Sequence, residues 1–408
     1  MTDIALNSGD TAWMLASTAL VLLMTPGLAF FYGGMVRTKS ALNMMMMSFI
    51  TIGIVSTLWV IYGFELAFGY KADSPWYGNL SFSGLGGMVN DLTNNGGIYP
   101  IPVLVFAAFQ LMFAIITPAL ISGAIADRTK FTAWAVFVAV WSTIVYFPVA
   151  HWVFAFGNKV GDTVTGAGFL ASKGLEDFAG GTAVHINAGA AGLALAIILG
   201  KRVGWRKESM RPHSLPLVLL GSGLLWFGWF GFNAASTLSA TDVQFATVAT
   251  NTAISGAFGA VASMLWITKR SGKPNPAMMI NGMLAGLVAI TAPCAFVAPW
   301  AAAVIGSIAA VLVIESTYFV EERLRIDDPC GAISVHGVCG MFGLLSVGVF
   351  ANGSYGAGWN GSESTGVAGI IDGNWGQLGA QALGAVTILV VNFGLSYGFF
   401  KLQNRLTK

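Results

Sequence analysis

Long apolar stretches recur along the whole chain, and only short polar segments separate them. A helix needs about 20 apolar residues to cross the ~30 Å hydrocarbon layer of a bilayer, whereas a membrane-spanning strand would show about ten alternating residues. The continuous apolar stretches therefore predict an all-α polytopic membrane protein with eleven transmembrane helices. The predicted spans are residues 11–36, 41–69, 98–126, 131–156, 178–200, 214–238, 243–267, 276–292, 296–320, 329–352 and 375–402.

Composition supports this class and excludes others. Charged residues make up only 9% of the chain and the mean hydropathy is +0.72, whereas soluble domains carry roughly 25% charged residues. A formal net charge of +2 gives no sign of the concentrated basic face with which proteins bind nucleic acid. The polar segments are too short for a soluble domain, so residues 1–408 are predicted to form a single membrane domain.

The basic residues predict how the chain is oriented. Among the 20 lysines and arginines, all but Lys71, Lys159 and Lys173 fall in loops on one side of the predicted spans. Cytoplasmic loops hold an excess of Lys and Arg. We therefore expect a multi-pass protein of the cytoplasmic membrane, with its N-terminus outside and its C-terminus in the cytoplasm. The polar outer segments are expected to be connecting loops, at residues 70–97, 157–176 and 353–374.

An internal repeat is the most informative feature of the sequence. Asp177 precedes His185 by eight residues, and Asp328 precedes His336 by the same spacing. Each aspartate is placed as a helix N-cap, and Pro329 suits a first helical turn. Eight residues at 1.5 Å each carry each imidazole roughly 12 Å deep, close to the middle of the membrane. Glycines follow each histidine at the same two spacings, as Gly189 and Gly192 in the first copy and Gly340 and Gly343 in the second.

The two copies enter the membrane from opposite sides under the predicted topology. We therefore predict inverted repeats at about residues 11–200 and 214–352, followed by an accessory helix at about 375–402. Inverted repeats are typical of transporters, whose site lies at the repeat interface near the midplane. A single histidine in a span could be a hydrogen-bonded packing residue, but two at matching depth favour a functional role.

The residues around the histidines do not predict a metal or cofactor site. Zinc takes three or four ligands, and of Cys330 and Cys339 only the latter shares a helix face with His336. Together with Cys294, these cysteines lie in apolar sequence and are predicted to be packing residues. No nucleophile and base stand at motif spacing and no phosphate loop is present, so we expect neither an enzyme nor a cofactor.

Four segments in order along the chain resemble the signatures of the Amt/Rh ammonium transporter family. They are TPGLAFFYGG at 25–34, the run DFAGGTAVHINAGAAGLALAIILGKR at 177–202, GWFGFNAAS at 228–236 and DDPCGAISVHGVCG at 327–340. The resemblance covers nearly the whole chain. It implies an eleven-span fold in a lipid membrane, a homotrimer with one pore in each subunit, and transport of ammonium or ammonia.

The resemblance also implies roles for the pore residues. His185 and His336 match the twin histidines of a narrow apolar pore, where one imidazole hydrogen-bonds the other. Phe113 matches the phenylalanine of the outer gate, and Phe232 matches its stacked neighbour. Without the motifs, each phenylalanine would be read as one packing residue among the 28 in the chain.

Two polar residues match the outer vestibule of the family. Ser236 matches the hydroxyl that accepts a hydrogen bond from ammonium, although it could instead bond a backbone carbonyl of its own helix. Asp177 matches the aspartate that holds the site and its negative potential, a role compatible with capping its helix.

The sequence departs from the family at three points. Phe154 stands three residues after His151, where bacterial transporters usually carry tryptophan, a stronger cation–π partner. Glu65 replaces a small polar residue near the outer end of the second span; it could add negative charge to the vestibule or form an interfacial carboxylate. The sequence ends at Lys408, without the extension that meets P-II-type regulators. These departures leave open an ammonium sensor that signals to a fused or partner cytoplasmic domain.

Overall fold

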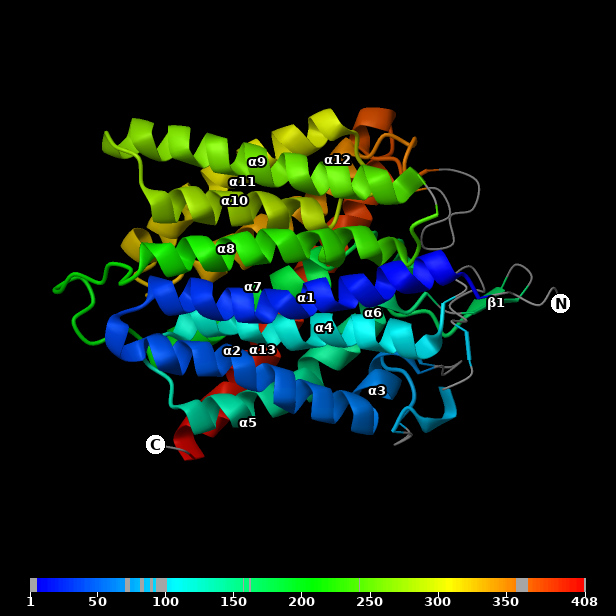
Figure 1. Cartoon of the computed structure of the whole chain (residues 1–408), viewed down its shortest axis with the longest axis horizontal. Coiled ribbons are helices and arrows are strands. Elements are labelled where there is room, and N and C mark those ends of the chain that lie inside the picture. Colours follow the sequence, from blue (N-terminus) through cyan, green and yellow to red (C-terminus); the bar gives the residue numbers. More distant parts are fainter. Residues whose placement is uncertain are drawn as a thin grey trace.

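The computed structural model describes residues 6–69, 74–80, 84–88, 91–92, 101–156, 158–160, 163–241, 243–356 and 366–406. Long helices run along one axis of the molecule, with β1 at one end and the last turns of α13 at the other (Figure 1). The π- and 3₁₀-helical segments carry the label η. In chain order the elements are α1 (Ser8–Met35), α2 (Thr38–Leu58), η1 (Trp59–Gly63), α3 (Phe64–Phe68), η2 (Gly86–Met88), α4 (Val103–Ile121), η3 (Ser122–Ile125), α5 (Phe131–Trp141), η4 (Ser142–Tyr146), α6 (Phe147–Phe154), β1 (Asn158–Val160), β2 (Thr163–Thr165), η5 (Ala171–Lys173), η6 (Gly181–Ile186), α7 (Asn187–Leu199), α8 (Leu215–Trp229), η7 (Phe230–Ala234), η8 (Ala235–Thr237), α9 (Val243–Ser271), α10 (Pro276–Thr291), α11 (Pro299–Tyr318), η9 (Phe319–Arg323), η10 (Ile333–Val338), α12 (Cys339–Phe350), η12 (Ile370–Asp372) and α13 (Trp375–Leu406).

These segments join into eleven helical spans, which confirms the predicted all-α membrane fold. Ten of the spans are long and apolar enough by themselves to cross a membrane, and α10 is shorter. The predicted boundaries differ by several residues. The third span begins at Val103 instead of residue 98, and residues 98–100 lie outside the described part of the chain. The ninth begins at Pro299 because residues 292–298 form the turn after α10.

One hairpin departs from the helical pattern. Strands β1 and β2 pair antiparallel within the predicted outer loop 157–176. Their alternation is too short to stand out from loop sequence, since three residues a strand is at the lower limit for strand length. The predicted outer loops 70–97 and 353–374 lie only partly within the described residues.

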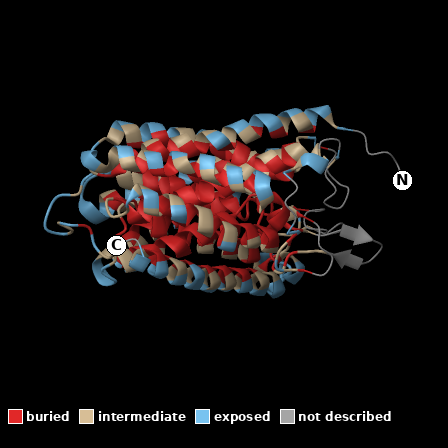
Figure 2. Cartoon of the chain, turned by 90° about the horizontal axis from the view of Figure 1, so that it is seen from below, coloured by how far each residue is buried: buried red, intermediate tan, exposed pale blue. Residues whose placement is uncertain are grey.

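Apolar side chains lie both in the centre of the bundle and on its outer surface. Buried residues fill its centre, and exposed residues are distributed over its outer helices (Figure 2). Many of the exposed ones are large and apolar, among them Leu42 on α2, Leu265 on α9 and Val390 on α13. Large exposed apolar surface is rare on soluble monomers but matches a lipid environment. The spans are therefore apolar on both faces.

Ion pairs gather the basic loops at one end of the bundle. Arg37 after α1 donates to Asp127 after η3 at 2.8 Å, and Arg202 after α7 donates to Asp327 before η10 at 2.8 Å. The loops that the sequence assigns to one side of the membrane thus meet at a single end. The orientation of this end toward the cytoplasm stays a prediction.

Candidate functional site: a histidine pair in a narrow passage

The two predicted histidine helices begin in the same unusual way. Each starts with a π-helical segment, η6 or η10, and continues as a regular α-helix, α7 or α12. Such wide turns are rare and are frequent at functional sites. The helices run antiparallel, because Arg202 just after α7 contacts Asp327 just before η10.

Glycines allow these two helices to touch at their crossing. A Cβ atom on Gly189 would lie 2.3 Å from the Gly337 Cα atom, and a Cβ on Gly340 would lie 3.0 Å from the His185 Cβ. Small residues at such contacts let membrane helices approach closely. The glycine that follows each histidine by four residues therefore sets the distance between the helices that carry the pair.

The crossing brings the two imidazoles together. Their ring centroids are 5.3 Å apart and their planes differ by only 8°. Neither nitrogen of His185 has a hydrogen-bond partner among the described residues, while His336 Nε2 lies 3.5 Å from the Tyr32 hydroxyl oxygen. The hydrogen bond between the imidazoles that the resemblance implies is therefore not made between these side chains in the structure.

A narrow cavity of about 20 Å³ runs past this pair. That volume holds roughly one water-sized molecule. Its walls are apolar except for the two imidazoles, the Tyr32 hydroxyl, the Trp229 indole N–H and the Cys330 thiol. The lining residues are Met24, Leu28, Phe31, Tyr32, Ile116, Leu120, Val184, His185, Leu225, Trp229, Phe232, Leu284, Cys330, Ala332, Val335 and His336.

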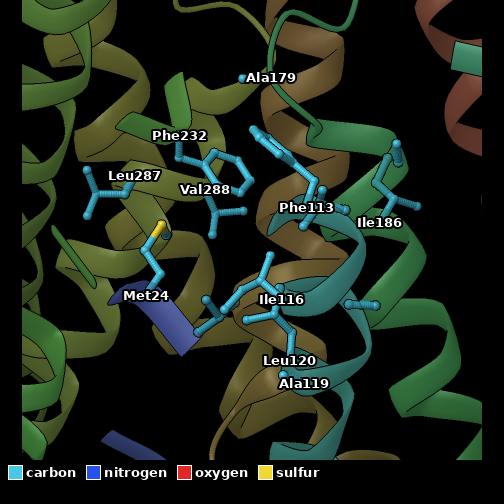
Figure 3. Packing of buried hydrophobic residues seen from close by; sticks show 14 of the residues in the cluster. Met24, Phe113, Ile116, Ala119, Leu120, Ala179, Ile186, Phe232, Leu287 and Val288 are labelled. Carbon is cyan, nitrogen blue, oxygen red and sulfur yellow. The ribbon is translucent and has the colours of Figure 1, made fainter. Parts of the chain in front are cut away.

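Two phenylalanines lie together beside the histidine pair. The Phe113 and Phe232 ring centroids are 4.3 Å apart, and Phe232 is 6.0 Å from the His185 ring. The rings of Phe113 and Phe232 lie next to each other, with Met24 and Ile116 below them in the view of Figure 3. The structure thus brings both predicted gate residues next to the predicted pore residues.

Sequence reasoning missed two residues of the passage. Trp229 stacks on His185 at 5.7 Å, and its indole N–H donates to the Thr291 hydroxyl. Tyr32 donates to the Leu120 carbonyl oxygen at 2.9 Å. Trp229 lies one helical turn before Phe232 and could have been found from that spacing, whereas nothing local in the sequence distinguishes Tyr32 from a packing residue.

Asp177 caps the start of the His185 helix. Its carboxylate accepts from the backbone N–H groups of Gly180, Gly181 and Thr182 at 2.9, 2.6 and 2.7 Å, and also from the Thr182 hydroxyl. Gly180 has a φ of 115°, a conformation that favours glycine. The cap that the sequence predicts is therefore present.

Ser236 and Phe154 are both buried. Ser236 donates to the Phe232 carbonyl oxygen at 2.9 Å, the local bond that the sequence left open as an alternative. This bond uses its only hydrogen and leaves the lone pairs of its oxygen as acceptors. Phe154 ends α6 and is 7% exposed.

Glu65 lies in the first turn of α3, at a tight corner of the chain. Its backbone carbonyl accepts from Gly69 and Asn79 at 2.8 Å each, and its carboxylate lies so close to Gly69 that an added Cβ would be 2.4 Å from Oε2. Both ring nitrogens of His151 lie near backbone carbonyl oxygens, those of Ala67 and Ser74. Gly69 and the backbone of the following loop therefore pack closely against Glu65.

The three cysteines are buried and form no disulfide. Within the described residues, no three His, Cys, Asp or Glu side chains cluster as metal ligands.

The chain was compared with known protein families and with characterised relatives. Residues 12–408 match the Ammonium Transporter Family. The chain is 48% identical to an ammonium transporter of Mycobacterium tuberculosis over 402 residues, covering 94% of this chain and 82% of the relative. It is 39% identical to an ammonium transporter of Bacillus subtilis, covering 95% and 91%.

Solved structures agree. Mep2 of Saccharomyces cerevisiae has a TM-score of 0.87 at 31% identity, covering 98% of this chain and 89% of that one. A structure described as a sensor Amt protein has a TM-score of 0.84 at 31% identity, covering 98% and 94%. This chain therefore belongs to the ammonium transporter family, whose members are membrane transporters and not enzymes.

Proposed function

We propose that the protein transports ammonium by binding the cation at the outer end and separating it into ammonia, which follows the histidine passage, and a proton, which the His185–His336 pair relays across, so that one charge crosses with each ammonium. The observation that carries this proposal is the buried His185–His336 pair in a cavity that is otherwise almost entirely apolar. The cavity has room for roughly one molecule of the size of water, and ammonia is of that size.

Elementary electrostatics favours ammonia over the cation inside this passage. Moving an ion into a low-dielectric interior has an idealised cost near 20 kcal/mol, whereas a neutral molecule avoids most of it. A potassium ion has no proton to lose and would keep the full cost. Imidazole nitrogens can donate or accept a hydrogen bond, and those of His185 have no other partner in the described residues. Ammonia supplies the partner that His185 lacks.

The outer residues suit recruitment of a cation. Aromatic faces attract cations by up to about 2 kcal/mol when desolvated, and Phe113 with Phe232 supplies two such faces, with Phe154 as a further candidate. The free lone pairs of Ser236 can accept from ammonium. Asp177 and Glu65 add negative charge near the outer end. We assign these residues to the recruiting vestibule.

We infer that the protein works as a homotrimer with one passage in each subunit. The passage is lined by α1, α4, α8 and the two histidine helices of a single chain, which supports a pore within the subunit and not between subunits. The inverted repeats, the cytoplasmic position of the basic end and a P-II-type regulator or fused signalling domain as partner are further parts of this proposal.

The test is the current of proteoliposomes after an ammonium jump. We expect a sustained current that scales with protein density and falls at least tenfold in His185→Ala. His213→Ala is the matched control, because His213 does not line the passage and its Nδ1 lies 2.9 Å from the Val36 carbonyl oxygen at the other end of α1. Equal currents in both variants and the wild type would overturn the proposed role of the pair.

Calorimetric binding on the same preparation separates transport from sensing. Tight ammonium binding with only a brief transient current would overturn transport and make the protein an ammonium sensor. A conducting site must also release its ion, so tight binding and fast flux exclude each other. The corner around Glu65, which differs from the family, would then be the first place to test, with Glu65→Gln.

A further inference from the structure

Gln381 on α13 is a polar side chain buried in the bundle outside the histidine passage. It has no solvent-exposed surface, and it is not among the residues that line the passage. A polar amide is costly to bury in an apolar interior unless its hydrogen bonds are made. The partners of this amide therefore indicate why a glutamine occupies the position.

All four hydrogen-bonding positions of the Gln381 amide are filled. Its oxygen accepts from the Glu176 backbone N–H at 2.9 Å and from the Gln377 side-chain amide at 3.0 Å. Its nitrogen donates to the backbone carbonyl oxygens of Glu176 at 2.6 Å and Leu344 at 3.1 Å. A glutamine amide offers two donors and two acceptor lone pairs. Because Glu176 presents both an N–H and a carbonyl, the amide fits in one orientation only.

Contacts on either side of this amide extend the attachment along one face of α13. One helical turn earlier, Gln377 also donates to the Gly174 carbonyl oxygen at 3.0 Å. One turn later, Gly384 lies so close to Leu175 that an added Cβ would be 2.5 Å from the leucine Cδ1 atom. Three successive residues of the chain are therefore fixed on α13 just before the first histidine helix.

Asp177 follows this attached segment directly. Its carboxylate caps the first histidine helix, and the next residue, Phe178, donates its backbone N–H to the Ala292 carbonyl oxygen at 3.2 Å. The peptide that carries Asp177 is thus fixed by α13 on one side and by the turn after α10 on the other. The position of the Asp177 carboxylate therefore depends on the Gln381 amide.

The fourth bond of the amide reaches the other histidine helix. Leu344 lies in α12, eight residues after His336. The amide nitrogen therefore joins the segment before the first histidine helix to the later part of the second. A buried donor or acceptor that loses its partner costs its full desolvation free energy. Replacing Gln381 with an apolar residue leaves such groups on both sides.

We propose that Gln381 is a positioning residue for the outer ammonium site, because it holds the peptide before Asp177 and so sets the position of the carboxylate that attracts the cation. This inference rests on the proposed recruitment of ammonium at the outer end. Coulombic attraction weakens with distance, so a displaced carboxylate binds the cation less tightly. Gln381 does not line the passage, so it affects ammonium affinity and not the maximal flux.

The test compares Gln381→Leu with Gln403→Leu in the full chain. Gln403 is the matched control, because it is also buried on α13 and its amide donates to the Ala133 carbonyl oxygen at the basic end. We expect Gln381→Leu to raise the calorimetric Kd for ammonium about fivefold, the effect of one lost hydrogen bond. The half-saturating concentration of the current should rise equally, with the maximal current unchanged. Gln403→Leu should keep the Kd of the wild type, and equal Kd values in the two variants would overturn the proposal.

A milder variant and a second measurement cover the case in which Gln381→Leu does not fold. Gln377→Ala removes one partner of the amide at a partly exposed position, and we expect a smaller rise in Kd. Hydrogen exchange of the Gly180 and Thr182 amides, which donate to Asp177, should be faster in this variant than in the wild type. Unchanged exchange together with an unchanged Kd would show that the attachment to α13 does not position the carboxylate.

The wild type and the variants test different statements. A wild type that binds ammonium without a sustained current contradicts transport, and the Kd comparison still decides the role of Gln381. An ammonium-conducting wild type whose Kd is matched by Gln381→Leu contradicts only the positioning role. A wild type that does not bind ammonium contradicts both.

Discussion

The two histidine helices share the spacing from aspartate to histidine, but the two aspartates have different surroundings. Asp177 accepts from four backbone N–H groups and a hydroxyl. Within the described part of the chain, Asp328 accepts only from the backbone N–H groups of Ala332 and Ile333, at 3.0 and 2.8 Å, and burial raises its pKa to about 6. The spacing is thus a property of the helix start, whereas the chemistry of each carboxylate depends on what the rest of the fold brings to it.

The two starts also differ in their charged neighbours. Asp328 follows Asp327, which is paired with Arg202 and lies near Arg128 at the basic end. Asp177 instead caps its own helix. One half of the crossing is therefore held by local hydrogen bonds, and the other half depends more on long-range charge.

The largest effect is expected from a substitution that pushes the two histidine helices apart where they touch. In Gly189→Ala the new Cβ meets the Gly337 backbone at 2.3 Å, and backbone cannot move aside as a side chain can. Overpacking of this kind costs about 1–3 kcal/mol or more. We expect a lower melting temperature in detergent and loss of the ammonium current.

Gly223→Ala is the control for that experiment. Gly223 lies in α8 with no atom within 4 Å of the position of an added Cβ. Alanine is favoured over glycine in a helix by about 1 kcal/mol, so this variant should be at least as stable as the wild type. A Gly189→Ala protein as stable and active as Gly223→Ala would contradict the crossing as described.

An effect of intermediate size is expected in the pH dependence of stability, which distinguishes the two aspartates. An acid whose folded-state pKa exceeds its unfolded value stabilises the fold most at low pH, and this contribution is lost as pH rises through the window between them. For Asp328 the window runs from its usual value of 3.8 to about 6, and the whole shift corresponds to about 3 kcal/mol. The melting temperature of the wild type should therefore fall across this window relative to Asp328→Asn.

Asp177→Asn gives the contrast at the other helix. It removes a charged acceptor of several hydrogen bonds, each worth about 1.5–3 kcal/mol, so we expect destabilisation at neutral pH. Melting curves of both variants from pH 4 to pH 8 provide the measurement. If Asp328→Asn leaves the pH profile of the wild type unchanged, the proton on Asp328 does not contribute to stability.

The smallest expected effect concerns the accessory helix α13, which supports the two histidine helices unequally. Asn392 donates to the Asn187 side-chain and carbonyl oxygens, and Gln381 donates to the Leu344 carbonyl oxygen of the second helix at 3.1 Å. Hydrogen bonds between membrane helices average about 0.6 kcal/mol. Asn392→Ala should lower the melting temperature slightly and leave the sustained current intact. A complete loss of current would show that α13 does more than support the pair.

Sequence reasoning predicted most of the fold, because membrane spans follow from apolar length alone. The aspartate-to-histidine spacing also indicated that both imidazoles lie at one depth, and the structure brings them to 5.3 Å. The roles assigned to Phe113, Ser236 and Glu65 stay predictions.

Other features depend on contacts that no local pattern contains. The contact of Gly189 with Gly337 and the close approach of the two imidazoles join chain segments that are distant in sequence, and the π-helical starts of both histidine helices lie at the same place. The short β hairpin and the ion pairs of Arg202 with Asp327 likewise join residues that are distant in sequence or too few to form a pattern.

The size of the histidine cavity has a consequence for kinetics. A passage with room for about one small molecule moves its cargo in single file, so a second molecule waits until the first has left. The ammonium flux then saturates once the passage is always occupied, even if the external ammonium concentration keeps rising. The size of the passage, and not the external ammonium concentration, therefore limits the maximal flux.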